Sequence, residues 1–163
     1  MTAHSMRPGV RIGVDYGAAR IGVAVTDPQG RFALPHETVA RSKWGEDIDQ
    51  IADLAEQLAA IEIVVGLPKH LSGASGASAK SARKFAHKLG SACPQLRVCM
   101  VDERLTTSTA HEQLAAVGID NRRRKDKVDQ VAATVILEQA IEIERRTGKE
   151  PGETISRGRP AGS

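Results

Sequence analysis

The chain has 163 residues, a formal net charge of +3 and hydrophobic residues at 40% of its positions, which fits one domain with a workable core. Aromatic residues make up only 2% of the chain, which argues against an RNA-binding platform built on stacking side chains. Cys93 and Cys99 are too few for a disulfide framework or a zinc site, and no apolar run approaches the roughly 18 residues of a membrane span. We therefore expect a cytoplasmic protein, whose mild positive charge permits a polyanionic partner without requiring one.

The N-terminal third predicts a meander of three antiparallel strands. Asp15 ends the first of its β-rich runs, at a position where a scaffold commonly presents functional groups. The alternative is that Asp15 only bonds the amides of the following turn. Residues 1–8 look like a flexible leader, and the three expected strands span residues 10–15, 21–26 and 31–39.

Beyond residue 43 the hydrophobic period becomes helical, and helices then alternate with short apolar strands. The expected elements are a helix to about residue 60, a strand at 61–66, a polar loop at 69–76, a helix from 77 to about 90, a strand at 96–101, a helix from about 106 to 117, a basic loop at 118–125 and a helix from 127 to about 146. The residues after 146 are rich in Gly, Pro, Ser and charge, so we expect a disordered tail at 147–163. The pattern predicts an α/β domain over residues 9–146, with a mixed five-stranded sheet (the antiparallel meander plus parallel strands) and helices on both faces.

Two further acidic positions accompany Asp15. Asp102 and Glu103 end the strand at 96–101, and because neighbours on a strand face opposite ways, only one of them can join Asp15. Spacing does not choose between them, and Arg104 could pair with the other. Asp129 shares a helical stripe with alanine and isoleucine, which directs it towards the sheet. The alternative is that Asp129, like Asp126 before it, only caps the first turn of the last helix.

Three carboxylates at one sheet edge would repel one another by about 4 kcal/mol per close pair, so such clusters persist where a divalent cation neutralises them. Oxygen ligands without histidine or cysteine favour Mg²⁺ or Mn²⁺ over zinc. Metal-bound carboxylates are suited to phosphodiester hydrolysis, in which one ion activates a water and another stabilises the leaving oxygen.

Four blocks of the sequence, in this order, resemble the YqgF/RuvX family. They are Gly-Val-Asp-Tyr-Gly-Ala-Ala-Arg-Ile-Gly-Val-Ala-Val-Thr-Asp at 13–27, Ile-Val-Val-Gly-Leu-Pro at 63–68, Val-Asp-Glu-Arg-Leu-Thr-Thr at 101–107 and Asp-Gln-Val-Ala-Ala-Thr-Val-Ile-Leu at 129–137. The resemblance implies an RNase H-like fold and a metal-dependent nuclease. It also implies that Asp15, Glu103 and Asp129 are the catalytic and metal-binding acids, which selects Glu103 over Asp102.

The same resemblance suggests a role in maturing the 5′ end of precursor 16S ribosomal RNA. Family members are also described as Holliday junction resolvases, and they often pair as homodimers. The chain departs from its relatives in the loop at 69–76, which lacks the Asn or Asp that they tend to carry before the glycine.

Candidate nucleic-acid contacts cluster around these acids. A dense basic run stands just before Asp129 and is suited to sequence-independent phosphate contacts, although most charge runs are merely solvated. Arg20, in the first hairpin turn, could touch a phosphate, but a turn arginine is more often just solvated. The candidates are Arg122, Arg123, Arg124 and Lys125 in the basic run, with Lys69, His70, Ser72 and Arg104 near the strand ends.

Two other classes of function fit parts of the pattern. An actin-like phosphotransferase also carries Asp-x-Gly after its first strand, but this chain has no second copy of the domain. A nucleic-acid-binding protein without catalysis would need only the basic run. Within the nuclease class, a junction resolvase requires a two-fold dimer, whereas an RNA-trimming enzyme can act as a monomer.

Overall fold

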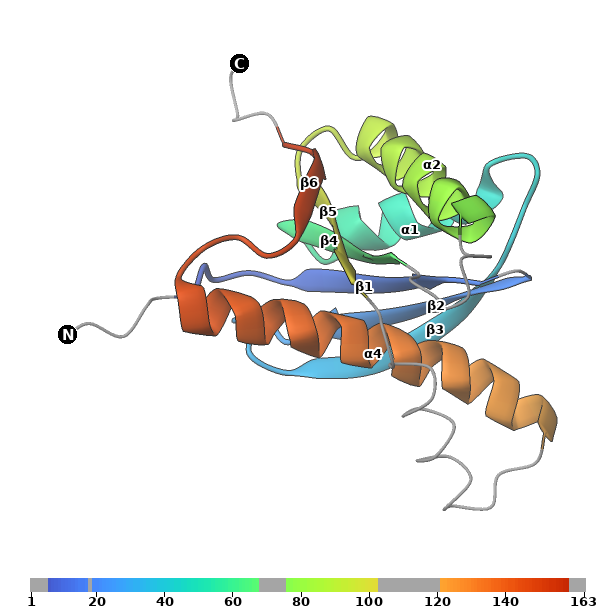
Figure 1. The fold of residues 1–163 in the computed structure, drawn as a ribbon, viewed down its shortest axis with the longest axis horizontal. Coiled ribbons are helices and arrows are strands. Elements are labelled where there is room, and N and C mark those ends of the chain that lie inside the picture. Colours follow the sequence, from blue (N-terminus) through green and yellow to red (C-terminus); the bar gives the residue numbers. More distant parts are fainter. Residues whose placement is uncertain (1–5, 18, 68–75, 103–120, 159–163) are drawn as a thin grey trace.

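The computed structural model describes residues 6–17, 19–67, 76–102 and 121–158 of the chain (Figure 1). These residues form one sheet with helices on both faces. The elements are β1 (Arg11–Tyr16), β2 (Arg20–Thr26), β3 (Ala33–Ala40), α1 (Glu46–Gln57), β4 (Glu62–Leu67), α2 (Gly76–Ala92), β5 (Arg97–Asp102), α4 (Asn121–Thr147) and β6 (Glu153–Ser156). No helix within these ranges is both long and apolar enough to span a bilayer.

The sheet has the strand order β3-β2-β1-β4-β5-β6. Strands β1, β2 and β3 pair antiparallel as a meander, while β4 runs parallel to β1 and β5 runs parallel to β4. The predicted α/β class, with its antiparallel meander and parallel strands, is therefore confirmed. The predicted count of five strands was one too low, because β6 pairs antiparallel with β5.

The expected disorder of the two ends was wrong for the residues that the structure describes. In the tail, β6 extends the sheet through pairs such as Met100 with Glu153. In the leader, Met6 packs against the apolar cluster beneath α4 and Arg7 bonds to Glu144. Composition argued for disorder in the tail, but backbone pairing there and ion pairs of the leader with distant residues order the described parts of both ends.

The last helix begins earlier than predicted. It starts at Asn121, so residues 121–125 of the expected basic loop are helical. The prediction that Asp126 caps the helix was wrong, because Asp126 lies inside the helix. Hydrophobic period gives little warning of this start, because residues 121–127 are mostly charged.

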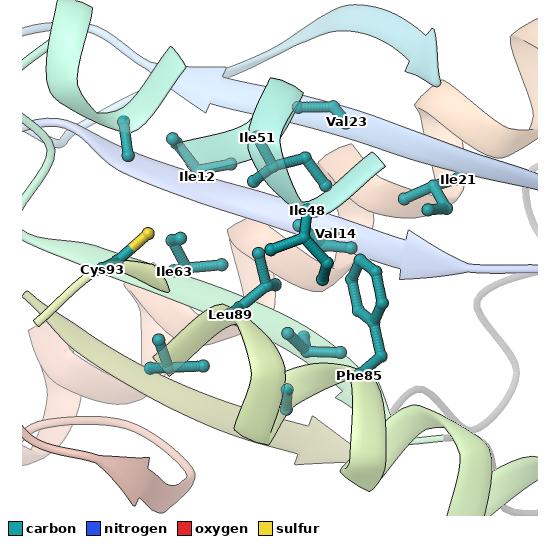
Figure 2. Close-up of a cluster of buried hydrophobic side chains, with 14 of the residues drawn as sticks. Ile12, Val14, Ile21, Val23, Ile48, Ile51, Ile63, Phe85, Leu89 and Cys93 are labelled. Atoms are coloured by element: carbon teal, nitrogen blue, oxygen red, sulfur yellow. The ribbon is translucent and has the colours of Figure 1, made fainter. Parts of the chain in front are cut away.

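Two apolar clusters lie on opposite faces of the sheet. On the α1/α2 face, Ile12 and Val14 of β1 pack with Ile51 of α1 and Leu89 of α2 (Figure 2). On the α4 face, small and medium side chains of the sheet meet one buried stripe of α4, made of Ala133, Ile136, Leu137, Ala140 and Ile141. Because side chains alternate along a strand, each residue of β1 belongs to one face or the other.

Buried charges close the end of the sheet where the parallel strands begin. Glu62, whose side chain is fully buried, accepts hydrogen bonds from Arg97 Nη1 at 2.6 Å and Arg7 Nη2 at 2.9 Å. Glu144 accepts bonds from Arg7 and from Arg11 Nη2, the latter at 3.1 Å to each carboxylate oxygen. These five residues join the leader, three strands and the end of α4, and we call them the buried ion cluster.

Removing one acid from the buried ion cluster should destabilise the protein strongly. Glu62→Ala leaves the guanidinium groups of Arg97 and Arg7 without their shared partner, and breaking a buried pair in this way costs about 3–5 kcal/mol. Urea titration should show this loss in the free energy of unfolding. The control, Glu142→Ala, removes an exposed pair with Arg145 at 3.1 Å and should cost less than about 1 kcal/mol; equal losses would contradict the role of the cluster.

The cluster also predicts how stability depends on pH. Burial alone would raise the pKa of Glu144, but the hydrogen bonds and charges of Arg7 and Arg11 outweigh burial and hold the pKa below its ordinary 4.5. A carboxyl with a depressed pKa stabilises the fold above 4.5 and loses that contribution as pH falls through its folded-state pKa. Unfolding measured from neutral pH downwards should therefore show stability falling below pH 4.5, with a shallower fall in Glu144→Gln.

Candidate active site

Asp15 lies near the end of β1 and belongs to the α4 face. Ile12 and Val14 point into the cluster on the α1/α2 face, and Tyr16 stacks on Phe85 of α2 with ring centroids 4.4 Å apart. Strand alternation therefore directs Asp15, between Val14 and Tyr16, to the opposite face. In the β1–β2 ladder, Asp15 stands across from Gly22.

Gly22 brings α4 against this point of the sheet. A Cβ atom at residue 22 would overlap the carbonyl oxygen of Asp129 and lie 2.9 Å from its Cβ. Further along β1, a Cβ atom at Gly13 would lie 2.7 Å from the carbonyl oxygen of Ala133. The helix backbone thus rests directly on two glycines, and Asp129 is placed beside the strand pair that carries Asp15.

The predicted orientation of Asp129 is confirmed. Its stripe partners Ala132, Ala133 and Ile136 are buried, and the Asp129 side chain is 16% exposed. The alternative, that Asp129 only caps the first helical turn, is excluded because α4 begins eight residues earlier, at Asn121. Two carboxylates from distant parts of the sequence, Asp15 and Asp129, therefore share the α4 face at the end of β1.

Arg20 is the functional candidate that sequence reasoning undervalued. Its Nε donates a hydrogen bond to Asp129 Oδ2 at 2.8 Å, and its side chain is 37% exposed. The tight turn places it there, because Gly17 N bonds the Arg20 carbonyl oxygen at 2.9 Å. A guanidinium on one side of Asp129 limits the rotation of its carboxylate. The only sequence signal was a basic residue at the start of the strand that pairs with the Asp15 strand.

Strand alternation along β5 shows on which face of the sheet Asp102 lies, which bears on the choice between Asp102 and Glu103. Val98 and Met100 pack on the α1/α2 face, and Asp102, which pairs with Leu67, lies on that same face. Asp102 is thus on the opposite face of the sheet from Asp15. Glu103 lies outside the described residues.

The side chains of the predicted nucleic-acid contacts lie outside what the structure describes. Lys69, His70, Ser72 and Arg104 lie outside the residues that the structure describes. Arg122, Arg123, Arg124 and Lys125 are placed by their backbone in the first turns of α4. Within the described ranges, no three His, Cys, Asp or Glu side chains are grouped so as to hold a metal ion.

The two cysteines take no part in the site. Cys93 and Cys99 are free and buried, and burial raises the pKa of the Cys93 thiol to about 11 and that of Cys99 to about 12. Both thiols are therefore protonated at neutral pH and unsuited to nucleophilic catalysis or to binding a metal.

The sequence profile described as "RuvX: Holliday junction resolvase" matches residues 9–143. The chain belongs to the RuvX family. A relative from Clavibacter sepedonicus named "Putative pre-16S rRNA nuclease" is 46% identical over 94% of this chain and 96% of its own length. A relative of the same name from Thermobifida fusca is 46% identical over 92% of this chain and 98% of its own.

RuvX membership confirms the family resemblance seen in the four sequence blocks, and with the relatives named as nucleases it confirms the nuclease class of enzyme. Among solved structures, "T. thermophilus RuvC in complex with Holliday junction substrate" is similar with a TM-score of 0.49 and 16% identity, covering 88% of this chain and 99% of that one.

The contact between Gly22 and Asp129 can be tested directly. Gly22→Ala should push α4 away from β1 and β2 and lower the free energy of unfolding by about 1–3 kcal/mol, with faster amide exchange in the N-terminal half of α4. Gly45→Ala is the control, because a Cβ there meets nothing within 4 Å and should cost only the left-handed backbone strain, about 1–2 kcal/mol. Unchanged exchange in α4 of Gly22→Ala would contradict the proposed contact.

Proposed function

We propose that the chain hydrolyses phosphodiester bonds in precursor 16S ribosomal RNA and thereby matures its 5′ end, with Asp15, Glu103 and Asp129 as the catalytic acids. The observation that carries the proposal is that Asp129 packs against Gly22, the residue across from Asp15 in the β1–β2 ladder, on the sheet face to which strand alternation assigns Asp15. The relatives named as pre-16S rRNA nucleases, which match nearly the whole chain, support the choice of substrate.

Glu103 is proposed as the third acid on indirect grounds. Asp102 belongs to the α1/α2 face, so it is unavailable to Asp15 and Asp129. Of the two acids at positions 102 and 103, Glu103 is the one that the family resemblance assigns to catalysis.

The donor set is suited to Mg²⁺ or Mn²⁺. Asp15 and Asp129 offer carboxylate oxygens only, and such hard ligands prefer these cations over zinc. When bound, the cation would activate a water and stabilise the leaving oxygen of the phosphodiester. Arg20 positions Asp129 through its 2.8 Å bond, and its exposed part can face a phosphate of the substrate.

Nucleic-acid binding is proposed to use the first turns of α4. Residues 122 and 125 precede Asp129 by about two helical turns and one, so the basic run leads directly to the proposed acids. Phosphate contacts of this kind are independent of sequence and weaken steeply with salt. Lys69, His70, Ser72 and Arg104 remain proposed contacts.

A junction resolvase is the second candidate, because the family description itself names that activity. Cutting two strands symmetrically requires a two-fold homodimer. Strand β3 lies at the edge of the sheet. Leu34 in β3 and Phe32 just before it are 59% and 69% exposed, which gives such a dimer an apolar surface to bury. A protein that binds nucleic acid without cutting it is the third candidate.

Cleavage assays with conservative variants test the proposal. In Mg²⁺, the wild type should cut precursor 16S RNA, whereas Asp15→Asn, Glu103→Gln and Asp129→Asn should each cut at least about tenfold more slowly, because a lost metal ligand costs no less than a lost outer partner. Binding of the RNA should be retained, since the substitutions remove no positive charge.

Asp102→Asn is the matched control and should cut as the wild type does. Loss of activity in this variant with full activity in Glu103→Gln would overturn the assignment of the third acid. Cleavage of four-way DNA but not of the RNA, by a species of dimeric mass in solution, would favour the resolvase. Binding without cleavage by the wild type would favour the non-catalytic protein.

A further inference from the structure

A cavity lies near the end of β1 on the α1/α2 face of the sheet, opposite the face to which Asp15 and Asp129 belong. It is open, has a volume of about 680 Å³ and stands between the end of β1, the segment after β3 and helix α2. Tyr16 and Phe85 form part of its wall, stacked with centroids 4.4 Å apart. The guanidinium of Arg41 lies 4.6 Å from the Tyr16 ring centroid, so the wall is held by aromatic and cation–π contacts.

The cavity is strongly basic. Its lining includes four cationic side chains, contributed by Arg41, Lys43, Lys84 and Lys88. The acidic side chain among its lining residues is Asp47, which is 5% exposed and accepts the backbone N–H groups of Ser42 and Ile48 at 3.1 and 2.8 Å. Among the lining residues that the structure describes, the one negative charge is thus engaged by the backbone, and the cavity favours an anion.

An exposed indole follows one of these cations in the sequence, although its own residue is not among those that line the cavity. Trp44 is 86% exposed and lies between Lys43 and Gly45, both of which line the cavity. Large exposed aromatic side chains beside basic groups are the combination that binds single-stranded nucleic acid, with phosphates on the cations and a base on the ring. A folded core gains nothing from an indole in this position.

The cavity and the acids are joined through one turn. Asp15 and Tyr16 are neighbours on β1 that face opposite sides of the sheet, and Ala19 lines the cavity while Arg20 bonds Asp129. The Arg41 N–H donates to the Ala19 carbonyl oxygen at 3.3 Å, which fastens the cavity wall to this turn. A nucleic-acid strand that left the acids and crossed the β1–β2 turn would therefore enter the cavity.

We propose that this cavity binds the single-stranded segment of the nucleic-acid substrate adjoining the scissile bond, with its phosphates on Lys84, Lys88 and Arg41 and a base against Trp44. The inference rests on the proposed nuclease function and adds to it a substrate-binding surface on the other face of the sheet. It also explains how a protein with few aromatic residues contacts a base: the contact is made by one exposed ring, and no stacking platform is needed.

Trp44 is the single tryptophan of the chain and therefore reports on its own contact. In an Asp15→Asn background, which prevents cleavage, a single-stranded RNA oligonucleotide should quench the tryptophan fluorescence. The double variant Lys84→Glu/Lys88→Glu should raise the dissociation constant for this oligonucleotide at least about tenfold. Lys149→Glu, an exposed change of the same sign between α4 and β6, should change the constant by about twofold or less.

The comparison ligands decide what the cavity recognises. Heparin, a polyanion without bases, should compete but should not quench by itself. Stronger quenching by fully duplex RNA than by the single strand, equal competition by a free nucleoside monophosphate, or equal weakening in Lys149→Glu and the double variant would each overturn the proposal.

Cleavage separates this inference from the function on which it rests. With Asp15 intact, the double variant should cut precursor RNA with a raised KM and a nearly unchanged kcat. If the wild type is active and the KM of the double variant is unchanged, the cavity proposal is wrong while the nuclease function still holds. A wild type that quenches with single-stranded RNA but cuts nothing would sink the nuclease and leave the binding surface.

Discussion

The close approach of α4 to β1 and β2 is the constraint on which the site depends. Gly13 and Gly22 have no Cβ atoms, so the carbonyl oxygens of Ala133 and Asp129 occupy the space that side chains would fill. Sheet and helix are thereby locked in one register along the helix axis. A shift of one turn, about 5.4 Å, would carry Asp129 away from Asp15 and separate the two carboxylates.

Acidic side chains are buried at one end of the sheet and partly exposed at the other. Where the parallel strands begin, the acids Glu62 and Glu144 are buried and bonded by three arginines, from the leader, β1 and β5, so their charge is paired inside the protein and stabilises the fold. Where β1 ends, Asp129 remains partly exposed. The buried carboxylates of Glu62 and Glu144 are held rigidly by their ion pairs. Asp129, which is partly exposed and bonded by Arg20, can be reached by a ligand.

The end of β1 also divides the two proposed surfaces. Alternation along the strand sends Asp15 to the α4 face and Tyr16 to the cavity on the α1/α2 face. Adjacent residues can therefore serve hydrolysis and substrate binding without competing for the same space. The β1–β2 turn, tied by the bond from Gly17 N to the Arg20 carbonyl oxygen, links the two surfaces, because Ala19 lines the cavity and Arg20 bonds Asp129.

Local pattern was sufficient for the meander, the buried parallel strands and the apolar stripe that carries Asp129, because strand alternation and helical period are properties of neighbouring residues. It also located Asp15. It could not find β6, the ordered leader or the pairing of Arg20 with Asp129, because each depends on a partner more than 50 residues away. Nor could spacing choose between Asp102 and Glu103, since the face of a strand is defined only once the sheet has packed against its helices. Which residues carry charge and which repeat on one face can be read from the order of residues along the chain. Which charges meet depends on the fold, because contact between distant segments follows from the packing of the whole chain.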